Sequence, residues 1–190
     1  MWTLTVGMKI IIVTVLLRCS YAFLDYNPEL GAYQDDGKCL NWSEPWYVVY
    51  RNYEDDPVFG DSTYCAYTTV AVSDPENSVI WTKEQGETTR YLKNTILSSP
   101  GYTSKDLVHV ESAEPGKQPG EHPEIDVYMR SIYINCNSCK VFRHLNIDAG
   151  AGCTLWKPKS KINQRDACCE FIYDLLCGTS PKYHISDNCS

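Results

Sequence analysis

Cysteine is the residue type of this chain that could do the most chemistry. Ten cysteines occur among 190 residues, and seven of them lie in the last third, starting with a Cys-x-x-Cys pair at Cys136 and Cys139. With Cys153 and Cys168 behind it, this pair could ligate zinc or cycle between thiol and disulfide. Cysteines spread over a whole exported domain are more typical of structural disulfides.

No other residues form a catalytic or metal-binding pattern. The four histidines, His109, His122, His144 and His184, lack the spacing of a zinc or catalytic motif. The sequence has no Gly-x-Ser-x-Gly turn, phosphate-binding glycine loop or dinucleotide fingerprint. We therefore expect a protein that is not an enzyme and needs neither cofactor nor metal.

The N-terminal segment favours disulfides over zinc. Lys9 precedes an apolar run at 10–17, and small residues follow Arg18. This pattern predicts a signal peptide at 1–22 and a mature domain at 23–190. Eight apolar residues are too few to cross a bilayer, which takes about 20, so we expect a secreted, extracellular protein without a membrane anchor.

The composition of the mature chain limits its partners. Without the leader it has 15 basic and 24 acidic residues, a net charge of −9, which argues against nucleic acid and anionic membranes. Nine cysteines remain, so one is unpaired or bridges two chains. Of two glycosylation sequons, the one at Asn41 is favoured over Asn188, whose sequon ends the chain and contains a cysteine.

Short β-rich runs fill most of the mature chain. The predicted strands are 46–53, 62–72, 78–83, 88–97, 105–111, 124–135, 138–145 and 152–156. Turn residues such as Pro100-Gly101 separate them. Eight consecutive strands predict an all-β fold, either an up-and-down antiparallel barrel or a sandwich.

The apolar period changes to that of a helix between 163 and 177, and Gly178 follows as a stop. We expect this helix to pack outside the barrel, where its cysteines would fix it.

The interior of such a barrel can hold one small ligand. The predicted strands carry many aromatic residues, among them Tyr47, Tyr53, Phe142 and Trp156. About half of the aromatics would only stabilise the fold, and the inward half would line a pocket.

Two segments resemble the tick salivary lipocalins, a family that includes the histamine-binding proteins. The run WYVVYRNYEDDPVFG at 46–60 resembles their first hairpin. The order of CKV at 139–141, TLW at 154–156 and a helix opening at Cys168-Cys169 is similar to their C-terminal signature. The resemblance implies an eight-stranded lipocalin barrel with a C-terminal α-helix, secreted in saliva to sequester or modulate host molecules.

The family's disulfides, carried onto matching positions, imply Cys65–Cys189, Cys139–Cys169 and Cys153–Cys177. For the three cysteines left over, we expect Cys136–Cys168 as a fourth bridge and Cys39 as the unpaired thiol.

The resemblance also implies where amines bind. Amine-binding relatives place one acid directly after the first signature cysteine and another before the Leu-Trp pair, where this chain has Lys140 and Thr154. A third family acid falls near Arg90. Because a buried ammonium needs carboxylates beside it, these replacements disfavour histamine and serotonin.

Other ligand contacts of the family are kept. Tyr53 and Asp56 remain, and Phe59 preserves an aromatic. If Tyr53 points inward, strand alternation places Arg51 and its alternate neighbours inward too. The candidate ligand-binding residues are Tyr47, Val49, Arg51, Tyr53, Asp56, Phe59, Arg90, Lys140, Phe142 and Trp156. Alternatively, the two arginines pair with strand carboxylates and Lys140 points outward.

Three hypotheses for function follow. The first is a secreted carrier of an apolar or amphipathic host molecule, such as a sterol, fatty acid or eicosanoid, which dampens host defence. The second is a histamine or serotonin scavenger that uses Asp56, Tyr53 and Phe59. The third is a barrel scaffold whose surface engages a host immune-cell protein.

Overall fold

The structure of the protein is a computed structural model that describes residues 24–40, 43–59, 65–73, 78–85, 88–113, 124–187 and 189. At 70–73, 78–85 and 88–90 it describes the backbone but not the side chains. The expected signal peptide at 1–22 and the sequon asparagines Asn41 and Asn188 lie outside the described residues, so they stay predictions.

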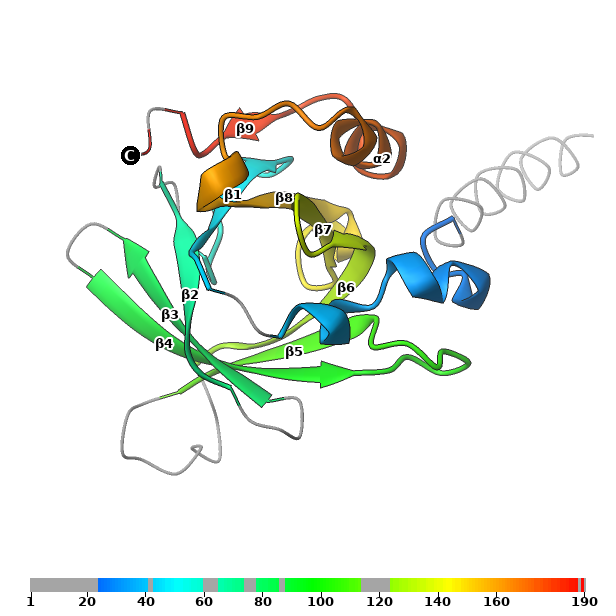
Figure 1. Ribbon diagram of the computed structural model, residues 1–190, viewed down its shortest axis with the longest axis horizontal. Coiled ribbons are helices and arrows are strands. Elements are labelled where there is room, and N and C mark those ends of the chain that lie inside the picture. Colours follow the sequence, from blue (N-terminus) through cyan, green and yellow to red (C-terminus); the bar gives the residue numbers. More distant parts are fainter. Residues whose placement is uncertain are drawn as a thin grey trace, which may run out of the picture.

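Eight antiparallel strands form the barrel (Figure 1). They are β1 Trp46–Arg51, β2 Tyr67–Ser73, β3 Ser78–Gln85, β4 Thr88–Leu97, β5 Leu107–Ser112, β6 Asp126–Asn135, β7 Cys139–His144 and β8 Gly152–Pro158. From β2 to β8 each strand pairs with the next, and β1 closes the ring by pairing with β8 and β2. The predicted up-and-down barrel is therefore confirmed, and the sandwich alternative is wrong.

One short strand was not expected. Strand β9, Tyr183–His184, pairs with Tyr50 and Arg51 at the end of β1. It brings the C-terminal segment alongside the barrel (Figure 1). A strand of two residues is too short to show a period, so it could not be predicted from the sequence pattern.

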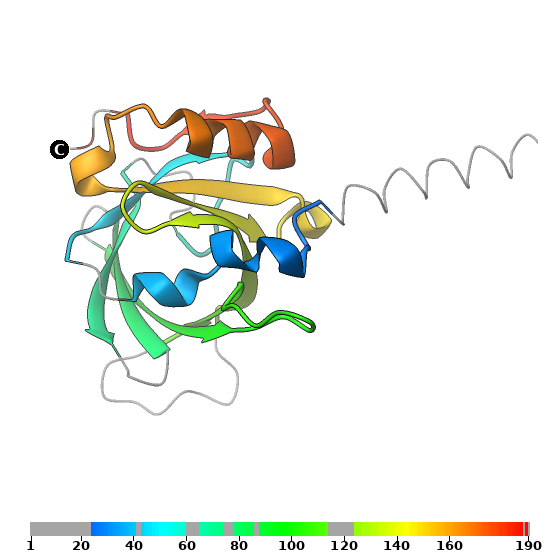
Figure 2. The same cartoon turned by 45° about the vertical axis from the view of Figure 1, so that its right-hand side comes forward.

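The C-terminal helix α2, Ala167–Cys177, packs outside the barrel as predicted (Figure 2). It begins four residues later than the expected 163, because the Asp166 carboxylate accepts hydrogen bonds from the backbone N–H groups of Cys168 and Cys169, 3.1 Å each. Its buried residues Cys169 and Tyr173 pack on the outer face of the sheet, in a cluster separate from the barrel interior.

An N-terminal segment of two 3₁₀ helices lies at one end of the barrel, beside β5 and β6 in Figure 1. These are η1, Pro28–Tyr33, and η2, Asp36–Cys39. The backbone N–H of Asp36 donates to the carbonyl of Lys105 at 2.9 Å. Two further 3₁₀ turns, η3 Asp148–Gly150 and η4 Lys159–Lys161, flank β8.

Four disulfides fix these outer segments to the barrel. Three are the pairs that the resemblance implied, Cys65–Cys189, Cys139–Cys169 and Cys153–Cys177. The expected fourth bridge is wrong: Cys136 pairs with Cys39, and Cys168 is the unpaired, exposed thiol. Cys136 follows β6 at the end of the barrel where η2 lies, whereas Cys168 is in the first turn of α2, where its thiol lies 3.7 Å from Tyr133 Oη of β6.

Candidate functional site

A β-bulge in β1 decides which of its side chains face the barrel interior. The pairing with β8 shifts between Val48 and Tyr50, so strict alternation fails there. Trp46 and Val48 belong to the interior cluster. Beyond the bulge, Arg51 pairs with Thr154, which hydrogen-bonds interior side chains.

The candidates Tyr47 and Val49 consequently lie on the outer face, which corrects the expectation from alternation. Tyr47 stacks on Tyr67 of β2 with ring centroids 4.9 Å apart. Val49 belongs to the cluster between the sheet and α2. Neither residue lines the interior pocket.

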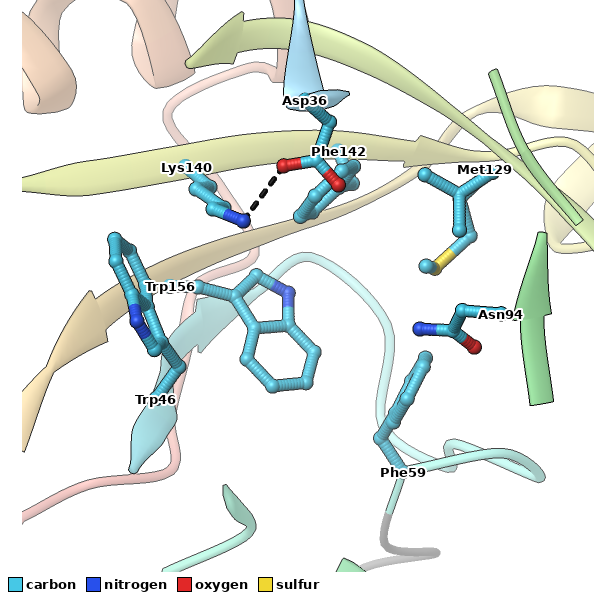
Figure 3. Close-up of a pocket in the computed structure, with 9 residues that line it drawn as sticks. Asp36, Trp46, Phe59, Asn94, Met129, Lys140, Phe142 and Trp156 are labelled. Carbon is cyan, nitrogen blue, oxygen red and sulfur yellow. Dashed lines mark hydrogen bonds and ion pairs between the residues drawn. The ribbon is translucent and has the colours of Figure 1, made fainter. Parts of the chain in front are cut away.

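The interior pocket is lined mainly by apolar and aromatic side chains (Figure 3). Its described lining consists of Asp36, Trp46, Phe59, Asn94, Val108, Met129, Lys140, Phe142 and Trp156. Four of the candidate residues, Phe59, Lys140, Phe142 and Trp156, are therefore brought together. Two aromatic rings, Phe59 and Trp156, meet edge to face with centroids 5.0 Å apart.

The side chains leave little free space between them. The cavity volume is about 20 Å³, which is room for about one water molecule. Pockets that hold a lipid-sized ligand measure roughly 300–1,000 Å³. A ligand must therefore displace lining side chains when it enters.

Lys140 and Asp36 form an ion pair in the pocket wall. Lys140 follows Cys139 on β7 and points inward, and its Nζ lies 2.6 Å from Oδ1 of Asp36 in η2 (Figure 3). Both side chains are buried, with 1% and 3% of their surface exposed. Burial lowers the pKa of Lys140 to about 8, although the Asp36 carboxylate opposes this shift. Asp36 therefore neutralises the one lysine in the described pocket lining.

A second buried group of opposite charges lies around Asp56. Its carboxylate accepts hydrogen bonds from Tyr53 Oη at 2.7 Å and from the backbone N–H groups of Val58 and Phe59 at 2.9 and 2.8 Å. Arg51 Nη1 lies 3.9 Å from Asp56, and both side chains are 1% exposed. Burial and the neighbouring Asp56 raise the pKa of Tyr53 well above its ordinary value, so its hydroxyl stays protonated.

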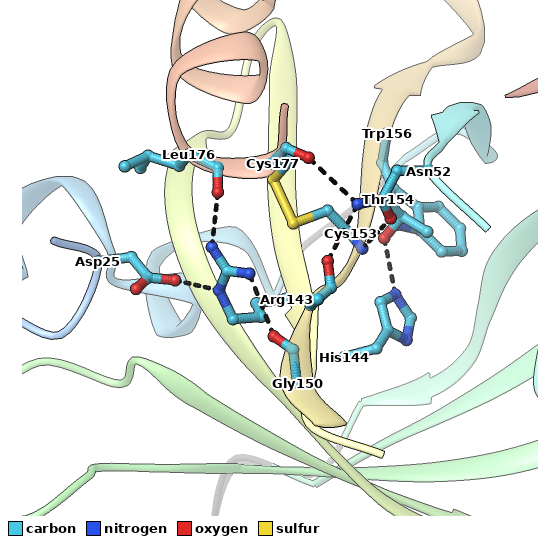
Figure 4. Close-up of a disulfide and its surroundings, with 11 residues drawn as sticks. Asp25, Asn52, Arg143, His144, Gly150, Cys153, Thr154, Trp156, Leu176 and Cys177 are labelled. Atoms are coloured by element: carbon cyan, nitrogen blue, oxygen red, sulfur yellow. Dashed lines mark hydrogen bonds and ion pairs between the residues drawn. A yellow bond between two sulfur atoms is a disulfide. The ribbon is translucent and has the colours of Figure 1, made fainter. Parts of the chain in front are cut away.

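A chain of hydrogen bonds joins three further interior residues (Figure 4). Trp156 Nε1 donates to Thr154 Oγ1 at 2.8 Å, and His144 Nε2 lies 2.9 Å from the same oxygen. Burial lowers the pKa of His144 to about 4, which keeps the imidazole neutral at ordinary pH. The family's position before the Leu-Trp pair thus holds a neutral bonded hydroxyl, not a carboxylate.

Several buried polar atoms of the inner wall lack a partner among the described residues. These atoms include Oδ1 of Asn94, a residue that lines the pocket, and also Thr68 Oγ1 and Ser131 Oγ. A buried acceptor without a donor costs about 1–3 kcal/mol. A ligand hydroxyl beside Asn94 would recover that cost.

The sequence found part of this site. Arg51, Tyr53 and Asp56 are brought together next to the pocket, whereas the side chain of Arg90 lies outside the described part, so its role stays a prediction. Five lining residues were not among the candidates: Asp36, Trp46, Asn94, Val108 and Met129. Asn94 lies two positions from apolar Leu92 and from apolar Ile96 on the same strand, so the period of two could have placed it on the inner face. Asp36 and Lys140 are 104 positions apart, so no local pattern indicates their contact.

The described residues contain no cluster of three or more histidine, cysteine, aspartate or glutamate side chains able to hold a metal ion. Within the same ranges, no helix has the length and apolar character needed to cross a membrane.

Solved structures similar to this chain include ligand complexes. One is a complex of LTBP1 with LTC4, at 10% identity over 80% of this chain and 86% of that chain, with a TM-score of 0.51. Another is apocrustacyanin C2, at 9% identity over 83% of each chain and a TM-score of 0.56. A complex of AM182 with serotonin is 20% identical over 83% of this chain and 90% of that chain, with a TM-score of 0.48. The first two support a shared barrel fold. No curated protein sequence matches the chain.

A family model that matches the amino-acid sequence shows which family the chain belongs to. The family model for "Tick histamine binding protein" matches residues 24–189, a span that includes every strand, helix α2 and all four disulfides. The resemblance stated from the sequence is therefore confirmed, together with the lipocalin fold that it implied. The chain belongs to the tick histamine-binding protein family.

Proposed function

We propose that this protein is a secreted carrier that binds one uncharged, amphipathic host molecule inside its barrel, without catalysis. The observation that carries the proposal is the pairing of Lys140 with Asp36 in the pocket wall. The other charged group beside the pocket, Arg51 with Asp56, is balanced in the same way. Because His144 is neutral, neither of these two groups offers a net charge to an ionic ligand.

This balance discriminates among ligand classes. A fatty acid carboxylate would have to share Lys140 with Asp36, and two carboxylates at one ammonium repel each other. A protonated amine would have to draw Asp36 away from Lys140, which would leave a buried ammonium unpaired. A sterol or another neutral lipid causes neither the repulsion between carboxylates nor the loss of the Lys140 partner. Its hydroxyl could donate to Asn94 Oδ1. Removing such a molecule from host tissue would dampen the host response.

Tryptophan fluorescence gives a direct test, because Trp46 and Trp156 line the pocket. We expect cholesterol or a long-chain alcohol to change the emission and saturate at one molecule per chain. The fatty acid of the same length should bind at least tenfold more weakly, and histamine and serotonin weaker still. Native mass spectrometry of protein purified from a lipid-containing medium should show one bound neutral lipid.

The second candidate is an amine scavenger, favoured by family membership and by the two interior carboxylates Asp36 and Asp56. Submicromolar histamine binding to an otherwise empty barrel, abolished in Asp56→Ala, would reverse the ranking of the two functions.

A further inference from the structure

The Lys140 amine lies in an apolar pocket beside a carboxylate, and these are the groups that imine formation needs. We propose that Lys140 captures a lipophilic aldehyde covalently, as an imine, with Asp36 carrying the protons. This inference rests on the proposed function, since the aldehyde must enter the same pocket as a neutral carrier ligand.

The position of the amine is the first support. The Lys140 side chain extends from β7 into the pocket and is 1% exposed. Its Nζ lies 5.0 Å from the centre of the Trp46 ring, and Phe142 and Trp156 line the same cavity. An aldehyde whose apolar tail enters this cavity is uncharged, so it leaves the ion pair intact until its carbonyl carbon reaches Nζ.

The protonation state of the amine is the second support. Only the neutral amine attacks a carbonyl carbon, and an amine in water with a pKa of 10.5 is neutral in about 0.3% of molecules at pH 8. Burial holds the pKa of Lys140 at about 8. A much larger share of Lys140 than of a lysine in water is then neutral at pH 8.

Asp36 supplies the proton transfers, because its Oδ1 lies 2.6 Å from Nζ. The carboxylate first takes a proton from the ammonium, and the amine adds to the carbonyl carbon with formation of a C–N bond. A proton moves from this nitrogen to the oxygen, which gives a carbinolamine. The Asp36 carboxyl then protonates the hydroxyl group, which leaves as water while the nitrogen lone pair forms the C=N bond.

The product keeps the electrostatics of the site. One aldehyde and one ammonium give one protonated imine and one water, with no oxidant or reductant. The positive nitrogen remains beside the Asp36 carboxylate, so the buried pair stays balanced. The same charge balance that disfavours acids and amines therefore accepts an aldehyde before and after reaction.

Dodecanal and dodecanol provide a matched pair of probes, since only the aldehyde can form an imine. The protein is incubated with dodecanal at pH 8, reduced with cyanoborohydride and analysed by intact mass and peptide mapping. We expect one adduct per chain, with the mass of the aldehyde less one oxygen atom, located on Lys140. Exposed Lys38, whose side chain is 56% exposed, is the internal control and should be modified at least tenfold less.

The matched variant is Asp36→Asn/Lys140→Met, which removes both members of the described ion pair. It should lose the adduct, and titration of the same variant with dodecanol measures separately what the ion pair contributes to binding. If both probes bind reversibly and Lys140 is modified no more than Lys38, the imine is overturned while the carrier function stands. If neither probe binds, both proposals fail.

Discussion

At the scale of single residues, two of the positions where the resemblance implies amine-binding carboxylates have different consequences in this chain. Lys140 brings a positive charge into the pocket, and Asp36 neutralises it. Thr154 replaces a charge with a hydroxyl that bonds Trp156 and His144. At these two positions the resemblance implies carboxylates, whereas this chain has a charge-paired lysine and a neutral hydroxyl.

His144 makes stability depend on pH. In the unfolded chain a histidine takes up a proton near pH 6.5, whereas burial keeps folded His144 neutral down to about pH 4. Between these values the unfolded state binds more protons, so the free energy of unfolding falls as pH falls, by roughly 3 kcal/mol in all. Urea unfolding at pH 7, 6, 5 and 4 measures this loss.

His144→Gln is the control, because an amide can bond Thr154 and does not titrate. Between pH 6.5 and 4, the variant should lose about 3 kcal/mol less of its free energy of unfolding than the unaltered protein does. Parallel pH profiles for the two proteins would contradict a role for His144.

The residues that sequence reasoning located are those with a local signal. Phe142 and Trp156 are aromatic residues on predicted strands, and Tyr53 and Asp56 lie in a hairpin with a family pattern. The partner of Lys140 could not be found in this way. Asp36 lies in an irregular segment, and only the closed barrel brings it to β7.

At the scale of elements, strand order and helix were predictable, but register was not. Period-2 runs and turn residues located all eight strands, because such patterns are local. A single extra residue at the β1 bulge reversed the faces of Tyr47 and Val49, since a shift of one position exchanges the two sides of a strand.

The Cys39–Cys136 bridge should hold η2 in place over the pocket. The two cysteines are 97 residues apart, and closing a loop of that length stabilises a fold by about 2–4 kcal/mol. In Cys39→Ser/Cys136→Ser we expect that loss, together with about tenfold or more faster hydrogen exchange at the Asp36 amide, which bonds the Lys105 carbonyl.

Cys153→Ser/Cys177→Ser is the comparison variant. It removes a bridge between β8 and α2, away from η2, and should leave exchange at Asp36 unchanged. Equal exchange at Asp36 in both variants would show that the Cys39 bridge does not control the segment.

At the scale of the whole molecule, the described part of the barrel interior is closely packed. The side chains around the pocket leave a cavity of about 20 Å³, so a ligand that enters there must displace them. Dense packing stabilises the empty protein, and the free energy needed to open the pocket lowers the affinity for any ligand. Stability and binding should therefore oppose each other at pocket-lining positions and be independent elsewhere.

Met129→Ala and Leu155→Ala test this opposition. Met129 is 3% exposed and lines the pocket, whereas Leu155 is fully buried between the sheet and α2. Each truncation should lower the free energy of unfolding by about 2–5 kcal/mol. Only Met129→Ala enlarges the pocket, so it should tighten dodecanol binding about tenfold, a gain of about 1.4 kcal/mol, while Leu155→Ala binds as the unaltered protein does. Fluorescence titration and urea unfolding on the same samples give both quantities. Weaker binding in Met129→Ala would mean that its contacts with the ligand outweigh the cost of opening, and that the empty barrel is already in its binding form.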